Sequence, residues 1–158
     1  MYKIAVINSS CVIISLLIFL LTYYKYIRDE LYEYIRDNKP KFLPTAEIYF
    51  SLHICGYIFL IKAVYSLYNR NQRYDNFLIS FSELVWLLSF YTMKMFTLSV
   101  VISNINLLLI IYCMYILIHT RQCILSLYLP HMITTILNAS LSYHIMIAYF
   151  RDRNNMVK

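Results

Sequence analysis

The stretch from Lys39 to Tyr65 reads KPKFLPTAEIYFSLHICGYIFLIKAVY, and it decides how the rest of the chain is interpreted. It begins as a polar segment with two prolines and continues as an apolar helix that contains a histidine, the only glycine and a lysine. Proline restricts the backbone, and about 20 apolar residues are enough for a helix to cross a bilayer. The stretch therefore predicts a proline-stiffened lid that leads into a membrane span with polar groups inside it.

The composition also indicates a membrane protein. Of the 158 residues, 61% are hydrophobic and 14% are charged, well away from the soluble balance of roughly a half and a quarter. A soluble domain of this length could not hide so much apolar surface from water. The net charge of +6 lies between and beside the apolar runs, which favours lipid headgroups and argues against nucleic acid as a partner. We therefore expect one membrane domain over residues 1–158, in contact with the lipid bilayer.

Five apolar runs predict an all-α bundle of five transmembrane helices. We place the spans at about residues 4–24, 48–68, 77–93, 95–118 and 130–150, with lengths suited to a hydrocarbon core of about 30 Å. Residues 25–46 form a lid loop with a short interfacial helix over Arg28–Arg36, and residues 151–158 form a polar tail. Polar turns over 69–76 and 119–122 and a very short connection at Lys94 join the other spans.

Five spans place the two ends of the chain on opposite sides of the membrane. The side with residues 25–46, Lys94 and the tail carries nine Lys and Arg residues, and the other side carries four. The positive-inside rule then puts the lid loop and the C-terminus in the cytosol.

Two charged side chains lie inside the predicted spans. Lys62 and Glu83 are each seven residues from the turn between spans two and three, which places both about 10 Å below the same surface. A charge at the bilayer centre costs roughly 2.5–3.5 kcal/mol, so each needs a partner or a route to water. Two interpretations stay open: a facing pair that lines a cavity, or Lys62 extended to the headgroups with Glu83 protonated or hydrogen-bonded.

Aromatic and histidine side chains within the spans are candidates for a site. His53 and Tyr57 are one helical turn apart and point to the same side of the helix. A neutral imidazole there could ligate haem iron or pass protons, or it could donate one hydrogen bond to a backbone carbonyl. Trp86, the only tryptophan, is either a packed aromatic or a flat wall for a planar ligand. His144, beside Tyr143, is a further candidate of the same kind as His53.

The sequence argues against hydrolytic, redox or metal chemistry. No serine or cysteine nucleophile has a spaced histidine and acid partner, and neither H-E-x-x-H nor C-x-x-C occurs. Free buried thiols are the expected state of the cysteines, which are Cys11, Cys55, Cys113 and Cys123. We therefore expect no enzyme, no catalytic residue and no metal site.

Three segments resemble the translocator protein family (TspO, the peripheral benzodiazepine receptor). The first is the opening stretch: the family's K-P-x-W-x-P-P loop is matched at Lys39, Pro40, Phe42 and Pro44. The W-x-x-x-Y of the family's second helix is matched in position by His53 and Tyr57.

The other two segments follow in the family's order. FSELVWLLSFY, residues 81–91, is similar to a family segment close to A-L-N-W-A-W-x-P-x-F-F, with matches at Trp86, Phe90 and Tyr91. Residues 129–131 resemble its L-P-Y start, and residues 141–143 fall within its cholesterol-recognition motif. Leu98 and Thr134 stand where two tryptophans line the family's pocket.

The resemblance implies a fold and a function. It implies helices packed in the order one, two, five, four, three, with a cavity beneath the lid that binds, and by extension transports, an apolar planar ligand such as haem, protoporphyrin IX or a sterol. The implied ligand-binding residues are His53, Tyr57, Trp86, Phe90, Leu137, Leu141 and Tyr143. The implied lid residues are Tyr34, Lys39, Pro40, Phe42 and Pro44.

The resemblance further implies a homodimer in the mitochondrial outer membrane or another intracellular membrane. In that packing order spans two and three are not neighbours, so a contact between Lys62 and Glu83 would have to cross the ligand cavity. Two other classes stay open. One is a membrane scaffold or interaction protein without a ligand, and the other is a small ion or proton conductor that uses Lys62, Glu83 and His53.

Overall fold

The computed structural model describes residues 2–26, 30–67, 74–119 and 125–156. This part of the chain is helical and contains no strand, which confirms the prediction of an all-α fold. The elements are α1 (Tyr2–Tyr26), α2 (Glu30–Asn38), α3 (Ala46–Leu67), α4 (Tyr74–Leu87), the π-helical turn η2 (Leu88–Thr92), α5 (Phe96–His119), the 3-10 turn η3 (Leu125–Leu127) and α6 (Leu129–Met156).

Three helices within the described residues are long and apolar enough to cross a membrane. Their apolar windows are Ala46–Ala63 in α3, Phe96–His119 in α5 and Leu129–Asn155 in α6. Shorter apolar helical segments occur at Val12–Tyr24 in α1 and Phe77–Thr92 in α4 and η2. Most of each long window faces outward, and an apolar outer surface of this length suits the hydrocarbon of a bilayer. These are the features of an integral membrane protein.

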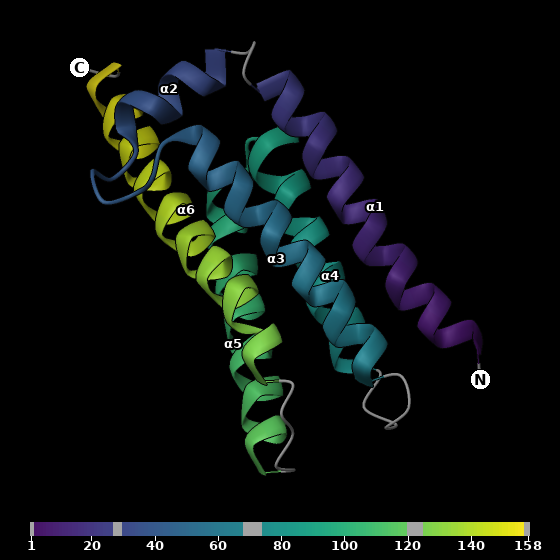
Figure 1. Cartoon of the computed structure of the whole chain (residues 1–158). Helices are drawn as coiled ribbons and strands as arrows, with labels where there is room; N and C mark the ends of the chain where they lie inside the picture. The colour runs from purple at the N-terminus through teal and green to yellow at the C-terminus, as the bar shows by residue number, and fades with distance from the viewer. Residues whose placement is uncertain (1, 27–29, 68–73, 120–124, 157–158) are drawn as a thin grey trace.

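The long helices pack against one another in a closed ring. α1 contacts α3, α3 contacts α6, α6 contacts α5, α5 contacts α4, and α4 contacts α1 (Figure 1). α1 begins at the lower end of the bundle in this view and α6 finishes at the upper end, where α2 lies across the bundle. The last helix therefore closes the ring between two helices that precede it in the chain.

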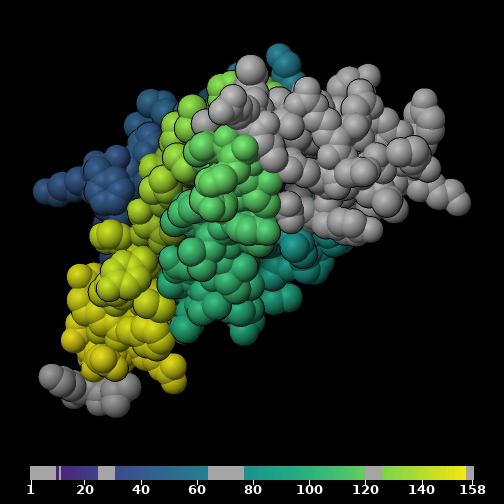
Figure 2. All heavy atoms as spheres, turned by 90° about the horizontal axis from the view of Figure 1, so that it is seen from below, coloured from purple at the N-terminus to yellow at the C-terminus, as the bar shows by residue number. Residues whose placement is uncertain are grey.

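α5 shows how each long helix divides into a buried and an outer face. Its buried residues recur every three or four positions, from Phe96 and Ser99 to Cys113 and Leu117, and this spacing is one stripe of an α-helix. Its outer face carries exposed apolar side chains such as Leu108. The outer faces of α5 and α6 lie side by side as one continuous surface in Figure 2.

Prolines mark two helix boundaries, one at each end of the bundle in Figure 1. α2 finishes with the Lys39 N–H donating to the Ile35 carbonyl, and Pro40 follows, where a helix would lose a backbone donor. α6 begins with Pro130 in its first turn, as the sequence predicted. The polar residues 151–156 continue α6 as helix and do not form a separate tail. The turns predicted over 69–76 and 119–122 lie mostly outside the described residues.

The connection between η2 and α5 is as short as predicted. Lys94 has a φ of 55°, in the left-handed region that non-glycine residues rarely adopt. The Met95 N–H donates to the Ser89 carbonyl at 2.8 Å, which closes the end of the π-helical turn. The chain thus reverses direction within three residues, between Thr92 and Phe96.

The only glycine in the sequence lies where α3 approaches α6. A Cβ added to Gly56 would lie 3.3 Å from Oγ1 of Thr134 and 3.5 Å from Cα of His131. Small residues allow two helix backbones to approach closely inside a membrane. Gly56 therefore sets the separation of the two helices that carry most of the site.

Candidate functional site

A cavity of about 290 Å³ lies at the upper end of the bundle, beneath α2 and residues 39–45. This volume is at the lower end of the range for small-molecule sites, about 300–1,000 Å³. Its lining residues are Tyr23, Tyr32, Ile35, Arg36, Lys39, Leu43, Pro44, Thr45, Ala46, Glu47, Tyr49, Tyr91 and Leu141.

The cavity combines an aromatic interior with charges at its rim. Tyr49 and Leu141 are buried at its base, whereas Arg36 and Glu47 are exposed. The Lys39 Nζ donates to the Pro44 carbonyl at 2.7 Å, so this ammonium group closes the 39–45 segment on itself just before α3 begins. The arrangement can accept a molecule with a flat apolar body, and its opening carries charges of both signs, the Arg36 guanidinium, which pairs with Asp37 at 3.0 Å, and the Glu47 carboxylate.

Two hydrogen bonds fasten α2 to the end of α6. The Tyr34 hydroxyl donates to Oδ2 of Asp152 at 3.0 Å, and Nη2 of Arg151 donates to Oδ1 of Asn38 at 3.2 Å. Burial, and after it the hydrogen bond to the Asp152 carboxylate, together raise the pKa of the Tyr34 phenol to about 12. The phenol therefore stays neutral and able to donate at ordinary pH.

Beneath the cavity, one asparagine connects α3 to α4. Oδ1 of Asn138 accepts a hydrogen bond from the Tyr49 hydroxyl and lies 2.8 Å from Nε2 of His53. Nδ2 of Asn138 donates to Oε1 of Glu83 at 3.0 Å. The side-chain amide of Asn138 thereby contacts the cavity-lining Tyr49, the imidazole of His53 and the carboxylate of Glu83 at the same time.

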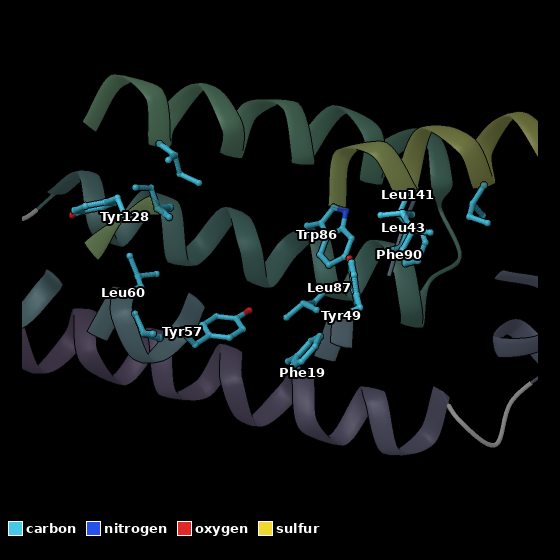
Figure 3. Close-up of a cluster of buried hydrophobic side chains, with 14 of the residues drawn as sticks. Phe19, Leu43, Tyr49, Tyr57, Leu60, Trp86, Leu87, Phe90, Tyr128 and Leu141 are labelled. Carbon is cyan, nitrogen blue, oxygen red and sulfur yellow. The ribbon is translucent and has the colours of Figure 1, made fainter. Parts of the chain in front are cut away.

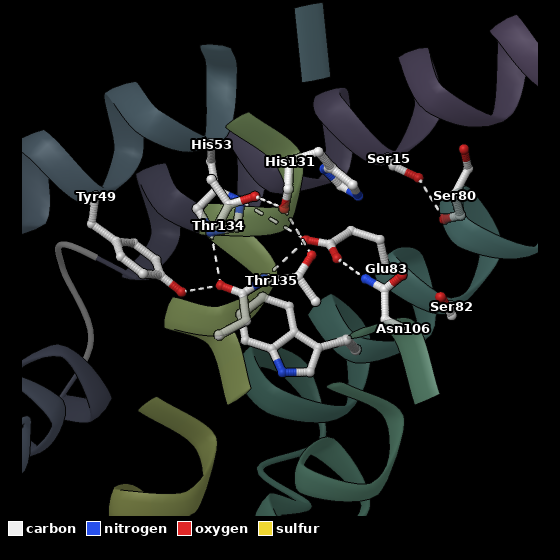
Figure 4. Close-up of polar contacts among 12 residues, drawn as sticks. Ser15, Tyr49, His53, Ser80, Ser82, Glu83, Asn106, His131, Thr134 and Thr135 are labelled. Carbon is white, nitrogen blue, oxygen red and sulfur yellow. Dashed lines mark hydrogen bonds and ion pairs between the residues drawn. The ribbon is translucent and has the colours of Figure 1, made fainter. Parts of the chain in front are cut away.

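The carboxylate of Glu83 is completely buried at the centre of this network (Figure 4). Its Oε2 accepts a 2.5 Å hydrogen bond from Nδ2 of Asn106 on α5, and its Oε1 accepts the bond from Asn138. Nδ1 of His53 lies 3.8 Å from Oε1. Four helices, α3 to α6, therefore each contribute one side chain to the network of His53, Glu83, Asn106 and Asn138.

Four of the predicted ligand-binding residues pack against one another and do not line the cavity. His53, Tyr57, Trp86 and Phe90 are each no more than 2% exposed. Figure 3 shows Tyr57, Trp86 and Phe90 within the cluster of buried side chains. The Trp86 ring centroid lies 6.3 Å from that of His53 and 5.4 Å from that of Phe90, and its Nε1 donates to Oγ of Ser142 at 2.9 Å. Ring stacking and this hydrogen bond fill the space that the sequence assigned to a ligand.

The other predicted binding residues are spread over α6. Leu141 lines the cavity, Leu137 is partly buried against the core, and Tyr143 is 51% exposed. His144 is also exposed, with Nδ1 2.9 Å from the Ser140 carbonyl. Among these four residues of α6, only Leu141 lines the cavity.

The predicted lid residues lie around the cavity but differ in what they contact. Lys39 and Pro44 line the cavity, and Pro40, the residue after Lys39, is buried. Phe42 is 66% exposed, with its ring edge-on to that of His144 at 6.0 Å. Phe42 therefore points away from the interior.

Lys62 and Glu83 do not form the facing pair that was one of the two interpretations. The Lys62 side chain is exposed on α3, while the Glu83 carboxylate is held by two amides and faces His53. The two hydrogen bonds to Glu83 agree with the part of the second interpretation that concerns the acid, and the extension of Lys62 to the headgroups stays a prediction.

The residues that hold the site together were missed by the sequence reasoning. Asn106, Asn138 and Ser142 are polar side chains inside apolar runs, and all three are buried. Each such group needs a hydrogen-bond partner in a membrane interior, so the sequence alone could have identified Asn106 and Asn138 as candidates for a buried polar contact. Tyr49 carried no comparable signal in a chain with 17 tyrosines, and Tyr91 was noted only as a match to the resembled family.

Among the described residues, three fully buried polar atoms have no hydrogen-bond partner: Oη of Tyr57, Oδ1 of Asn106 and Nε2 of His131. In the same part of the chain, no group of three His, Cys, Asp or Glu side chains is placed to hold a metal ion. Cys55 and Cys113 form no disulfide bond, and the side chains of Cys11 and Cys123 lie outside the described set.

No family model, no curated protein and no solved structure matches the chain. The function is therefore inferred from the cavity and the polar network.

Proposed function

We propose that this chain is a TspO-like membrane protein with five spans that binds an apolar planar ligand, such as a tetrapyrrole or a sterol, in the cavity beneath α2. The observation that carries the proposal is the cavity of about 290 Å³ under the segment that the sequence assigned to a lid. In this proposal α1 and α4 with η2 supply the two spans besides α3, α5 and α6. The lid and the C-terminus face the cytosol from an intracellular membrane.

The packing order of the helices supports the proposal. Numbered as spans, the ring of α1, α3, α6, α5 and α4 runs one, two, five, four, three. This is the order that the resemblance implies, and five helices can be arranged around a ring in several other orders. The cavity also lies at the end of the bundle that carries the segment assigned to a lid.

The chemistry of the cavity favours a tetrapyrrole over a sterol. Tyr23, Tyr49 and Tyr91 present aromatic rings to a flat ligand, and Arg36 stands at the rim. Protoporphyrin IX has two carboxylates that a guanidinium group recognises, whereas a sterol has only a hydroxyl group. The ligand's apolar body would lie against Leu141, and its acidic edge would face the headgroup region.

A ligand-free scaffold is the second candidate, and one observation favours it. His53, Tyr57, Trp86 and Phe90 fill the interior that a deep ligand would need. A scaffold would keep this packed interior and use its outer faces for partners. A conductor that uses Lys62 has less support, since Lys62 is exposed and apart from Glu83.

The test is a titration of the purified protein with protoporphyrin IX, followed by the Soret band. We expect saturable one-to-one binding that Leu141→Trp weakens at least about tenfold, because the larger ring occupies the base of the cavity. Ile147→Trp is the matched control, since Ile147 lies on the exposed face of the same helix, and it should bind as the wild type does. Absence of saturable binding to the folded protein, or equal binding by the two variants, would exclude a ligand site in this cavity.

A further inference from the structure

The amide of Asn138 determines where one hydrogen of His53 lies. Because Nδ2 of Asn138 donates to Glu83, its Oδ1 can only accept. Nε2 of His53, 2.8 Å from that oxygen, must therefore be the donor. The opposite amide orientation would place Oδ1 against the Glu83 carboxylate, which would be repulsive. His53 thus carries a hydrogen on Nε2 whether or not the ring is charged.

The other nitrogen of the ring faces a carboxyl oxygen. Nδ1 of His53 lies 3.8 Å from Oε1 of Glu83, and both side chains are 1% exposed. With a neutral ring and an ionised carboxylate, lone pairs would face each other and one negative charge would be buried without a cation. One added proton removes both problems, because it occupies Nδ1 or Oε1 and makes the pair neutral overall.

We propose that His53 and Glu83 form a proton-binding site inside the bundle. The proton comes from water, and it forms an N–H bond on Nδ1 of His53 or an O–H bond on Oε1 of Glu83. Asn106 and Asn138 keep the carboxylate in place in both states, because each donates to one of its oxygens.

The side chains that face His53 and Glu83 are compatible with the binding of a single proton by this pair. The described titratable groups that face it are Tyr49 and Tyr57 from α3, Tyr91 from η2 and His131 from α6. α1 and α5 contribute groups that do not titrate, Phe19 and Asn106. A phenol is either neutral or negative, so none of the three tyrosines can supply a positive charge that would balance an ionised Glu83, and His131 is the one group among the four that could.

Two aromatic rings favour a cationic form of His53. The imidazole lies between Phe19, with ring centroids 4.6 Å apart, and Trp86, with centroids 6.3 Å apart and planes 6° apart. Aromatic faces attract cations, and this attraction is largest away from water. The same stacking makes Trp86 a reporter of the charge on His53.

Tyr49 connects the proton site to the cavity. It lines the cavity, and its hydroxyl donates to the same Asn138 oxygen that accepts from His53 (Figure 4). A ligand that takes the Tyr49 hydrogen bond leaves that oxygen to His53 alone and so changes the affinity of the pair for its proton. This coupling rests on the proposed ligand function, whereas the proton site does not.

The proton site is tested on the purified full chain in detergent, without ligand. Emission from Trp86, the only tryptophan, is recorded against pH while circular dichroism verifies that the helices persist. We expect a one-proton transition in emission, because a proton on Nδ1 of His53 or on Oε1 of Glu83 changes the net charge beside the indole, and lower emission on the acid side marks the proton on His53. Glu83→Gln and His53→Gln should abolish the transition. His131→Gln and Glu47→Gln, which change another buried histidine and an exposed acid, should retain it.

A flat wild-type emission over the whole pH range in which the protein stays helical overturns the proton site, whether or not any variant folds. A transition that persists unchanged in folded Glu83→Gln overturns it as well.

The coupling is tested separately through the affinity for protoporphyrin IX on the two sides of the transition. In the wild type we expect the affinity for protoporphyrin IX to differ by about fivefold or more between the two sides of the transition. This difference should exceed that in Glu83→Gln, and it should be absent in Tyr49→Phe. Binding with equal pH dependence in the wild type and Glu83→Gln overturns the coupling. Absence of binding overturns the proposed function, and the ligand-free titration still decides the proton site.

Discussion

The hydroxyl of Tyr34 donates a 3.0 Å hydrogen bond to the carboxylate of Asp152, and this bond joins α2 to the end of α6 across 118 positions of sequence. Asn38 reinforces the connection, since its Nδ2 donates to the Tyr34 carbonyl and its Oδ1 accepts from Arg151. The cover of the cavity is therefore attached to the end of α6 through side chains of α2.

Tyr34→Phe should loosen α2 without affecting the bundle. The variant loses one partly exposed hydrogen bond, for which we expect a local cost of about 0.5–1.5 kcal/mol. Amide hydrogen exchange should become faster in α2 and stay unchanged in α3 and α5. Tyr143→Phe, an exposed tyrosine on α6, is the matched control. Equal exchange rates in the two variants would contradict a role for the Tyr34–Asp152 bond.

The same bond should give α2 a characteristic response to alkali. The pKa of Tyr34 rises from 10.0 to about 12, first through burial and then through Asp152, so folding favours the neutral phenol. Its contribution is complete below pH 10 and is lost as the pH rises through about 12. The stability difference between the wild type and Tyr34→Phe should therefore be constant below pH 10 and vanish by pH 12, as measured by thermal melting followed by circular dichroism. A difference that grew with pH would contradict this assignment.

Gly56→Leu should be strongly destabilising, whereas Gly56→Ala should be close to neutral. A single methyl group meets Oγ1 of Thr134 at 3.3 Å, a tight contact, and the gain in helix propensity of about 1 kcal/mol offsets it. Leucine would push α3 and α6 apart at a cost of about 1–3 kcal/mol. Unfolding in detergent measures both, with Ser51→Leu on the exposed face of α3 as control. An unaffected Gly56→Leu would show that the two helices do not need this close approach.

Lys94→Gly should stabilise the protein by about 1 kcal/mol. Lys94 has a φ of 55°, which disfavours a side chain and suits glycine. Lys94→Ala removes the same long side chain but keeps the unfavourable backbone, so it should give no gain. The melting temperatures of the two variants make the comparison, and equal values would show that the backbone at Lys94 costs little.

A double-mutant cycle should reveal the bond between Trp86 and Ser142. Ser142→Ala leaves the indole N–H buried without its partner, for which we expect a cost of about 1–3 kcal/mol. Trp86→Phe removes both the donor and part of the ring. The double variant should cost less than the sum of the two single variants. Additive costs would mean that the two side chains do not interact energetically.

The helices could be predicted because the apolar runs are long and because prolines lie at two of the helix boundaries. Pro40 and Pro130 lie at the boundaries where the structure ends α2 and begins α6. α2 was also predictable from its position before Asn38 and Pro40, with a shift of about two residues from the expected Arg28–Arg36. These features depend on local backbone chemistry, which the sequence displays directly.

The contents of the site could not be predicted in the same way. His53 and Trp86 were placed against a ligand, but the structure stacks them on each other, because a ring in an apolar interior packs equally well against a neighbouring helix. The partners of Glu83 come from Asn106 and Asn138, at 23 and 55 positions along the chain, and only the packing of the helices brings them together.

The position of α6 in the ring has a consequence for biosynthesis. α6 leaves the ribosome after α3, α4 and α5, yet it supplies Asn138 to His53 and Glu83, Ser142 to Trp86, and Asp152 to Tyr34. Until it is inserted, the earlier helices hold a carboxyl group, an imidazole and an indole N–H without these partners. A nascent chain that stops before residue 138 should therefore be recognised as unassembled by membrane quality control, even though its first four long helices are complete.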